Sequence, residues 1–270
     1  MSARRSPLLV GVVALAAAGA VAVLAAGALA DGAPATGGVH GGSDQTVVRG
    51  AGNIRPAVAR FRTLLGPDNG GGPGRPASGR RAIDWDAVPD RLASPNALPG
   101  GFFNARSAPR ARGARLQTPG DHVAVSADSS NPAGAAVRFG DVNPAYSGRF
   151  RTFSPQRLFS PIGSNIVNLR FSVPGTGRPA VVRGFGAVYT GVDRRENTAF
   201  RYFDAQGRSL GTFRVPVSRN GLSFLGVVFP SAVVARVRIE YGSGALGPTD
   251  SPTYDAAVMD DFIYGEPQPG

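Results

Sequence analysis

From Val233 to Tyr241 the chain reads VVARVRIEY. Residues 233, 235, 237, 239 and 241 are apolar, whereas three of the four residues between them are charged. Successive side chains of a β-strand point to opposite faces of a sheet. This alternation therefore predicts a strand with one face in the core and one face in solvent.

The same alternation occurs twice earlier in the chain, at residues 167–173 (VNLRFSV) and 83–88 (IDWDAV). Clusters of turn-forming residues separate the candidate strands, and no helical pattern lies between them. We therefore predict an all-β domain over residues 81–266, an antiparallel β-sandwich or jelly roll. Its further candidate strands are residues 121–127, 180–191, 198–204, 209–217, 222–229 and 255–264.

The first thirty residues have the pattern of a signal peptide. Arg4 and Arg5 precede an uncharged run from residue 8 to residue 30, which ends in the small-x-small sequence Ala28-Leu29-Ala30. A charged start, an apolar core and such a site predict export and cleavage. The alternative is an uncleaved anchor, since the run is long enough to span a bilayer. We expect a secreted or extracellular protein, in contact with a membrane only if the segment is retained.

Three short segments connect this signal to the sandwich. Residues 31–52 are predicted to be a disordered leader, and residues 67–80 a flexible Gly/Pro linker. Between them, residues 53–66 predict a short amphipathic helix, with Asn53 as its cap, Pro56 in its first turn and Gly66 at its end. Residues 267–270 are expected to be a tail. The expected apolar face of the helix consists of Ile54, Val58, Phe61 and Leu65.

The composition is basic but has no lysine. The chain contains 29 arginines and 18 acidic residues, which gives a formal net charge of +11. A basic balance is typical of proteins that bind nucleic acid, anionic membranes or acidic polymers. Abundant Arg, Ala, Gly and Pro also indicate a genome rich in G and C, and the arginines form no run. We favour this compositional explanation and expect no nucleic-acid partner. Cysteine is absent, which excludes disulfides, thiolate nucleophiles and cysteine metal sites.

No catalytic residue is assigned from the sequence. Gly207–Gly211 matches the G-x-S-x-G pattern of hydrolases, but the residues after it predict a strand rather than the helix that a nucleophile elbow requires. His122 is the only histidine within the predicted domain. The alternative is a hydrolase that cleaves polysaccharide with a pair of carboxylates. Its candidate residues are Asp84, Asp86, Asp193, Glu196, Asp260 and Asp261.

Two acidic pairs suggest a cation site. Asp84 and Asp86 are two apart on a predicted strand and share a face, whereas Asp260 and Asp261 place one carboxylate on each face of the last strand. Jelly rolls often pair their first and last strands, which would bring the four residues together. A structural Ca²⁺ ion is one prediction. The alternative is that arginines neutralise the buried carboxylates.

Tyr146 and Tyr254 are the candidate ligand-binding residues. Both lie in loop-like, proline-containing segments, so they are the tyrosines most expected to be exposed. Exposed aromatic rings stack on sugars in carbohydrate-binding sandwiches. The alternative is that each tyrosine covers an edge of the sandwich.

Six short sequence segments also resemble those of a known group of proteins. They are GRRAIDWD at 79–86, PNALPGGFFN at 95–104, FRTFSPQRLF at 150–159, FGAV at 185–188, FDAQG at 203–207 and MDDFIYGE at 259–266. Together they resemble a family of uncharacterised secreted bacterial β-sandwich proteins, some of whose relatives carry a C-terminal PEP-CTERM sorting tail. The resemblance implies export and a non-catalytic role in the envelope or outside the cell. This chain ends in Pro267-Gln268-Pro269-Gly270, without such a tail.

These observations predict a secreted, non-catalytic β-sandwich protein. Its expected partner is an extracellular glycan or an anionic polymer of the envelope, with a structural cation in the protein. Two alternatives are the polysaccharide hydrolase and a structural or adhesive protein without a small ligand.

Overall fold

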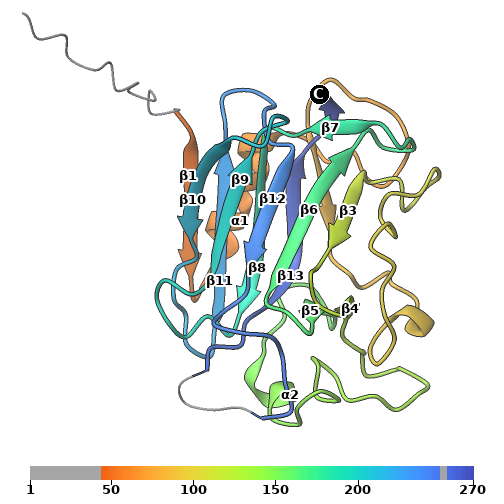
Figure 1. The fold of residues 1–270 in the computed structure, drawn as a ribbon, viewed down its shortest axis with the longest axis vertical. Helices are drawn as coiled ribbons and strands as arrows, with labels where there is room; N and C mark the ends of the chain where they lie inside the picture. The colour runs from red at the N-terminus through yellow and green to blue at the C-terminus, as the bar shows by residue number, and fades with distance from the viewer. Residues whose placement is uncertain (1–43, 250–253) are drawn as a thin grey trace, which may run out of the picture. The chain divides into compact units, whose positions relative to one another are not determined.

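The computed structural model describes residues 44–249 and 254–270 and shows two antiparallel β-sheets packed face to face (Figure 1). The predicted all-β sandwich is therefore confirmed. The predicted signal peptide at residues 1–30 lies outside the described residues, as does most of the predicted leader.

The first sheet is built around the last long strand of the chain. That strand, β13 (Val258–Gly265), also pairs with β2 (Arg80–Ile83), which lies off the main path of the sheet. The order along the main path is β1 (Thr46–Ala51), β11 (Leu222–Val228), β8 (Gly184–Thr190), β13, β5 (Phe159–Ile162) and β4 (His122–Val125).

The second sheet contains the alternating stretch at residues 233–241. Here β12 (Arg236–Glu240) pairs with β9 (Ala199–Phe203) on one side and with β6 (Ile166–Ser172) on the other. Strand β3 (Ala114–Gln117) pairs with β6 off the main path. The order along that path is β10 (Ser209–Arg214), β9, β12, β6, β7 (Pro179–Val181) and β14 (Gln268–Pro269).

The main core lies between the two sheets and is rich in aromatic rings. Trp85 is fully buried and stacks on Phe159 at 4.3 Å between ring centroids, with the edge of Phe262 at 4.8 Å. The predicted alternation holds in β12, where Val237 and Ile239 are buried in this core. Burial of such side chains is the main stabilising contribution in a domain without disulfides.

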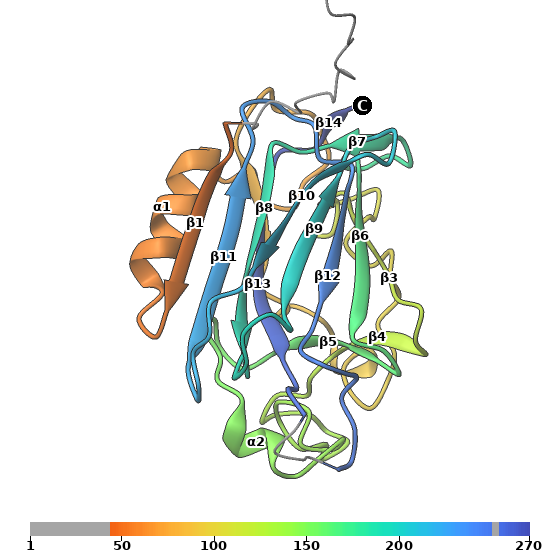
Figure 2. The same cartoon turned by 60° about the vertical axis from the view of Figure 1, so that its left-hand side comes forward.

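The helix α1 (Arg55–Leu65) covers the outer face of the first sheet (Figure 2). Its predicted apolar face is confirmed, since Ile54, Val58, Phe61 and Leu65 are all buried. Phe61 packs edge-on against Phe224 of β11, with ring centroids 5.4 Å apart. The predicted side-chain cap is wrong: Ile54 occupies the N-cap position and no side chain caps the helix.

Three connecting segments are more ordered than the sequence predicts. Residues 46–51, expected in the leader, form β1 and pair with β11. Part of the tail forms β14 on β7. The segment expected to be a flexible linker is held in place, because buried Arg81 donates to the carbonyl of Gly72 at 2.7 Å and pairs with buried Glu266 at 2.8 Å.

Two short helices complete the structure, η1 (Asp90–Leu92) and α2 (Tyr146–Arg149).

Candidate functional site

The acidic residues predicted to meet do lie near one another. Strand β2 pairs with β13 so that Ile83 lies opposite Phe262, and Asp84 therefore follows β2 close to Asp260 and Asp261. The negative charges of Asp84 and Asp261 both act on Asp86. The expected pairing of the segment around residue 83 with the last long strand is thus confirmed.

Asp84 and Asp86 do not share a strand face, contrary to prediction. Strand β2 ends at Ile83, and Trp85 adopts a left-handed backbone conformation with φ of 69°. The chain turns there because the Trp85 ring enters the core, where its Nε1 donates to the carbonyl of Asp260 at 2.7 Å. Asp84 is left exposed, and Asp86 is half-buried.

A β-bulge determines how the side chains of Asp260 and Asp261 are oriented. The sequence predicts strict alternation at these two positions. The register of β13 on β8 shifts between Met259 and Phe262, and both of these residues face the main core. Two residues of a bulged strand occupy the space of one on its partner. The prediction of one carboxylate on each face is therefore wrong.

Protein donors surround the two buried carboxylates. Asp260 accepts hydrogen bonds from the backbone N–H of Phe153 at 2.6 Å and from the hydroxyl of Ser154 at 2.7 Å. Asp261 pairs with the guanidinium of Arg62 on α1 at 3.0 Å. The acidic cluster therefore joins β13 to α1 and to the loop that precedes β5.

Burial makes ionisation of this cluster unfavourable. Burial, together with a smaller contribution from the neighbouring charge of Asp261, raises the pKa of Asp260 to about 8. Burial likewise raises the pKa of Asp86 to about 6, with a smaller contribution from Asp84. At neutral pH Asp260 is consequently protonated in most molecules.

The cluster does not fit the predicted calcium ion. Calcium takes six to eight oxygen ligands and favours ionised carboxylates. In residues 44–249 and 254–270, no three acidic or histidine side chains are arranged to hold a metal ion. Asp261 instead has the arginine partner that the sequence offered as the alternative.

The two candidate tyrosines are not exposed rings. Tyr146 is fully buried in a small core beside Phe150, with ring centroids 4.8 Å apart, so its assignment to a ligand surface is wrong. Tyr254 is half-buried against the same core, and its hydroxyl donates to the carbonyl of Ala245. Both residues cover the edge of the sandwich, which was the alternative prediction.

The outer face of the second sheet carries a feature that the sequence analysis missed. Neighbouring residues of each strand are buried in the core, so the residues between them point outward. Six of these outward residues are arginines, and they come from five adjacent strands. We call this surface the basic face; its arginines are Arg115, Arg170, Arg201, Arg214, Arg236 and Arg238.

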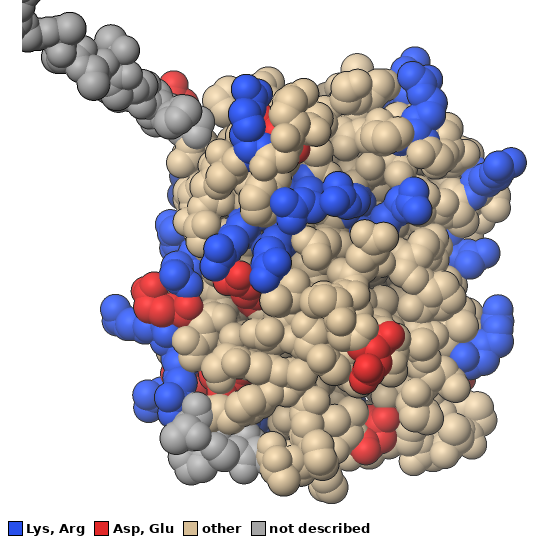
Figure 3. Space-filling view, in the orientation of Figure 1, with Lys and Arg blue, Asp and Glu red and all other residues tan. Residues whose placement is uncertain are grey.

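The strand register brings five of these arginines into two rows, and Arg214 lies outside both. Arg115 lies opposite Arg170, and Arg170 lies opposite Arg236. In the second row Arg238 lies opposite Arg201. Adjacent strands are about 4.8 Å apart, so each row is a ladder of like charges across the sheet. Figure 3 shows arginine side chains in a band across this face.

Three of the six arginines have an acidic partner, since Arg214 pairs with Glu196 at 2.7 Å and Arg201 and Arg238 share Glu240. Glu240 pairs with Arg201 at 3.0 Å and contacts Arg238 at 3.5 Å. Within the described residues, Arg115, Arg170 and Arg236 have no acidic partner. Like charges directly opposite one another across a sheet are destabilising. The ladder therefore stores repulsion that an anionic ligand would relieve.

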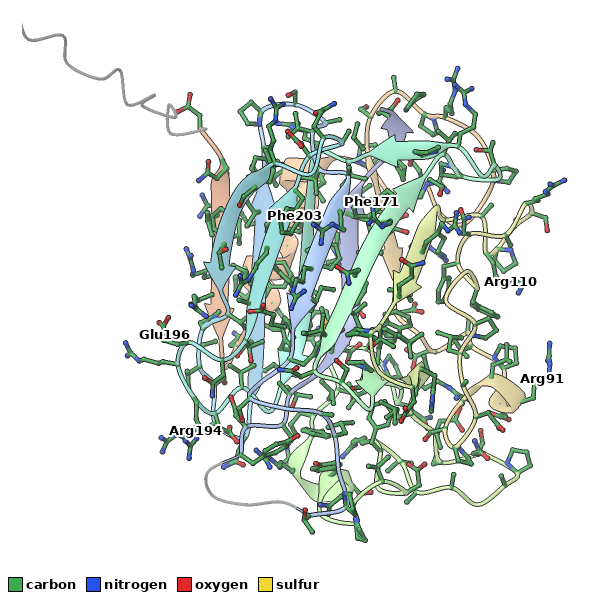
Figure 4. All side chains as sticks on the ribbon, viewed as in Figure 1. Arg91, Arg110, Phe171, Arg194, Glu196 and Phe203 are labelled. Carbon is green, nitrogen blue, oxygen red and sulfur yellow. The ribbon has the colours of Figure 1, made fainter. Side chains whose placement is uncertain are left out.

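Arg236 shows the effect of this crowding. Its guanidinium lies 3.7 Å from the centroid of the Phe203 ring and donates to the side-chain carbonyl of Asn168 at 3.0 Å. Burial lowers the pKa of Arg236, and the charges of Arg170 and Arg238 lower it further. Figure 4 shows Phe203 on this side of the sheet.

A hollow adjoins one end of the basic face. It has a volume of about 450 Å³, and Arg115, Gln117 and Arg170 form part of its wall. The face thus combines a flat, charged surface with a recess. A strand-by-strand count would have assigned these arginines to solvent-facing positions, because every one of them alternates with core residues, but it would not have shown which of them are neighbours.

Neither of the two hollows that contain an acidic residue in the described part of the chain is lined by a pair of carboxylates. Asp121 is the one acidic residue that lines a hollow of about 580 Å³ near His122, and Asp84 is the one that lines a hollow of about 310 Å³ near Phe102. Asp193 and Glu196, the other hydrolase candidates, pair with Arg149 and Arg214. This geometry gives the hydrolase hypothesis no support.

In the described ranges, no helix has the length and apolar character needed to cross a bilayer. Comparison with models of protein families, with curated proteins and with solved structures gives no match. Function is therefore argued from the sites of this chain alone.

Proposed function

We propose that this chain is an exported, non-catalytic protein that binds an acidic polysaccharide of the cell envelope or its surroundings through the basic face. The observation that carries the proposal is the ladder of arginines that lack acidic partners. Arginine binds carboxylates and sulfates with two parallel hydrogen bonds, which suits the acidic groups of such polymers. The predicted signal peptide supports a ligand outside the cell.

The shape of the face favours a chain-like ligand. The arginine rows cross four strands, and a repeating anion can contact several guanidinium groups at once. Gln117 and Asn168 lie in register with the row that contains Arg238 and Arg201. Their amides can donate to and accept from sugar hydroxyls. A neutral glycan would leave the arginine charges without partners.

The aromatic residue on this face argues for polysaccharide over single-stranded nucleic acid. Proteins that bind single strands stack bases on open aromatic rings. Phe203 is half-buried, and the guanidinium of Arg236 already covers its ring. No stacking platform is therefore open at this position.

The test compares binding of polygalacturonate, neutral dextran and a single-stranded DNA of similar length by the full chain. We expect saturable binding of polygalacturonate that weakens as salt rises, and no binding of dextran. The double variant Arg115→Gln/Arg170→Gln should bind polygalacturonate about tenfold more weakly or worse, as expected for the loss of two charged contacts.

The matched control is Arg49→Gln/Arg60→Gln, which removes the same charge from exposed positions on β1 and α1, away from the basic face. It should bind almost as tightly as the unmodified chain. Equal weakening in both double variants would mean that only net charge matters. Tighter binding of the DNA than of polygalacturonate at the same salt concentration would replace the proposed ligand.

A further inference from the structure

A second recess lies apart from the basic face, between β2 and the loop that leads to β3. Its volume is about 310 Å³. That is near the lower end for ligand pockets, which usually range from about 300 to 1,000 Å³. It would hold a molecule the size of one substituted ring. None of the arginines of the basic face lines it.

The wall of this recess is apolar and rigid. Phe102 and Phe103 are 6% and 5% exposed and meet edge-on at 4.9 Å between ring centroids. Phe103 in turn packs against the buried Trp85 at 5.6 Å. The rings are therefore fixed by the main core and present a preformed surface to a flat ligand.

Three arginines surround this apolar wall. The guanidinium of Arg110 lies 4.7 Å from the centroid of the Phe102 ring, and Arg91 and Arg112 also line the recess. Figure 4 shows Arg91 and Arg110 on the same edge of the molecule. Asp84 is the one acid among the lining residues. The lining thus carries three positive charges and one negative charge.

The guanidinium groups of these three arginines have no acidic partner within ion-pair distance in the described part of the chain. The Nη1 of Arg112 donates to the carbonyl of Ala82, but its Nε is buried and has no partner among these residues. A buried N–H without an acceptor is costly, so the environment of the Arg112 guanidinium is short of acceptors.

The loop that carries two of these arginines is held in a defined conformation. The backbone N–H of Arg112 donates to the carbonyl of Phe103 at 3.0 Å, and that of Ala105 donates to the carbonyl of Arg110 at 3.2 Å. The hydroxyl of Tyr264 on β13 donates to the carbonyl of Arg112 at 2.9 Å. The backbone that carries Arg110 and Arg112 is thus fixed before any ligand binds, which lowers the entropic cost of ordering the loop.

We propose that this recess binds a small organic anion with a flat apolar body, an aryl carboxylate being the simplest case. The apolar body fills the recess beside Phe102 and Phe103, where the Arg110 guanidinium already lies over the Phe102 ring, and the carboxylate accepts hydrogen bonds from Arg110 and Arg112. Arg91 adds positive charge at the rim. The proposal does not depend on the polysaccharide function, because the two sites share no residue.

The experiment titrates the full chain with benzoate and with benzamide, its neutral counterpart of the same shape, by ligand-observed NMR at low salt. We expect saturable binding of benzoate in the millimolar range, and binding of benzamide about tenfold weaker because the charged hydrogen bonds are lost. Absence of saturable benzoate binding, or equal binding of the two compounds, would overturn the proposal.

Variants locate the site. Arg110→Gln should weaken benzoate binding about tenfold, whereas Arg106→Gln, an exposed arginine of the same loop that does not line the recess, should leave it unchanged. Since Arg110 is exposed, its variant is expected to fold. A second variant, Arg112→Gln, should weaken binding too. Equal affinities in Arg110→Gln and Arg106→Gln would place the ligand elsewhere and reject this site.

Discussion

The two sheets of the sandwich share a core but differ on their outer faces. The outer face of the first sheet is covered by α1, so all seven residues of β8 and all eight of β13 are buried. The outer face of the second sheet is open and carries the arginine ladder. A strand buried on both faces needs no alternation, whereas a strand with one solvated face requires it.

Glycines let the helix approach the first sheet closely. Gly186 and Gly226 lie opposite each other on β8 and β11, and a Cβ atom at Gly226 would lie only 2.5 Å from the ring of Phe61. The ring fills the space that two side chains would otherwise occupy. Within the described residues no helix covers the second sheet, and its outward positions carry charged side chains. The outer face of the first sheet is therefore suited to packing against a helix, whereas that of the second sheet is suited to contact with solvent or a ligand.

The largest expected effect comes from Phe61→Ala on the covered side. The ring is fully buried, so its removal should lower the free energy of unfolding by about 3–5 kcal/mol. Denaturant unfolding measures this value. Phe203→Ala on the basic face is the control; because Phe203 is half-buried, its loss should cost clearly less. Equal losses would contradict the contrast between the two faces.

Adding one carbon atom under the helix should have the next largest effect. Gly226→Ala forces a Cβ against the Phe61 ring and should destabilise the fold by about 1–3 kcal/mol. Gly148→Ala in α2 meets nothing within 4 Å and should be neutral or slightly stabilising. Thermal unfolding of both variants distinguishes overpacking from a general effect of removing glycine.

The third prediction concerns the pH dependence of the covered side. The pKa of Asp260 rises from an ordinary value of 3.8 to about 8 in the folded chain, chiefly through burial. The folded state therefore binds more protons than the unfolded state between these values, and its stability falls as pH rises from about 4 to about 8. We expect the free energy of unfolding to fall continuously between pH 5 and pH 8.

Denaturant unfolding at several pH values tests this expectation. Asp260→Asn removes the titrating group and should flatten the profile, although it also changes the hydrogen bonds to Phe153 and Ser154. The slope of stability against pH, rather than its absolute level, is the decisive quantity. A profile that rises through this range in the unmodified chain would be the opposite of the expected sign.

The smallest expected effect on stability comes from the open side. Arg115→Gln/Arg170→Gln removes two opposed positive charges that have no acidic partner in the described part of the chain. Stability should stay the same or rise by up to about 1 kcal/mol, since like charges across a sheet repel. The gain should shrink as salt is added. A marked loss of stability would show that these arginines hold the fold together.

The sequence predictions were most accurate for elements that have one buried and one solvated face. Regular alternation located β6 and β12 closely, because each has one solvated face. The apolar face of α1 was likewise readable from its spacing. Strand β1 was missed because residues 46–51 are few and lie next to a Gly-rich segment. The order of the strands had no local signal, since pairing joins segments far apart in the chain.

The candidate sites show the limits of local pattern. The acidic pairs were correctly expected to meet, yet the turn at Trp85 and the bulge at Asp260 changed how they face each other. Tyr146 looked exposed in a proline-containing segment, but a small core closes around it. The arginines looked scattered because two arginines on one strand are separated by a core residue. Only the strand register shows that they form rows.

The sequence by itself determined the class of fold, the amphipathic helix and the excess of arginine over acid. These follow from periodicity and composition, which act over a few residues. The tertiary structure alone decided which sheet face is covered, where the bulge lies and which arginines are neighbours. Those features depend on the pairing of distant strands and on the fit of Phe61 to Gly226, which no local pattern encodes.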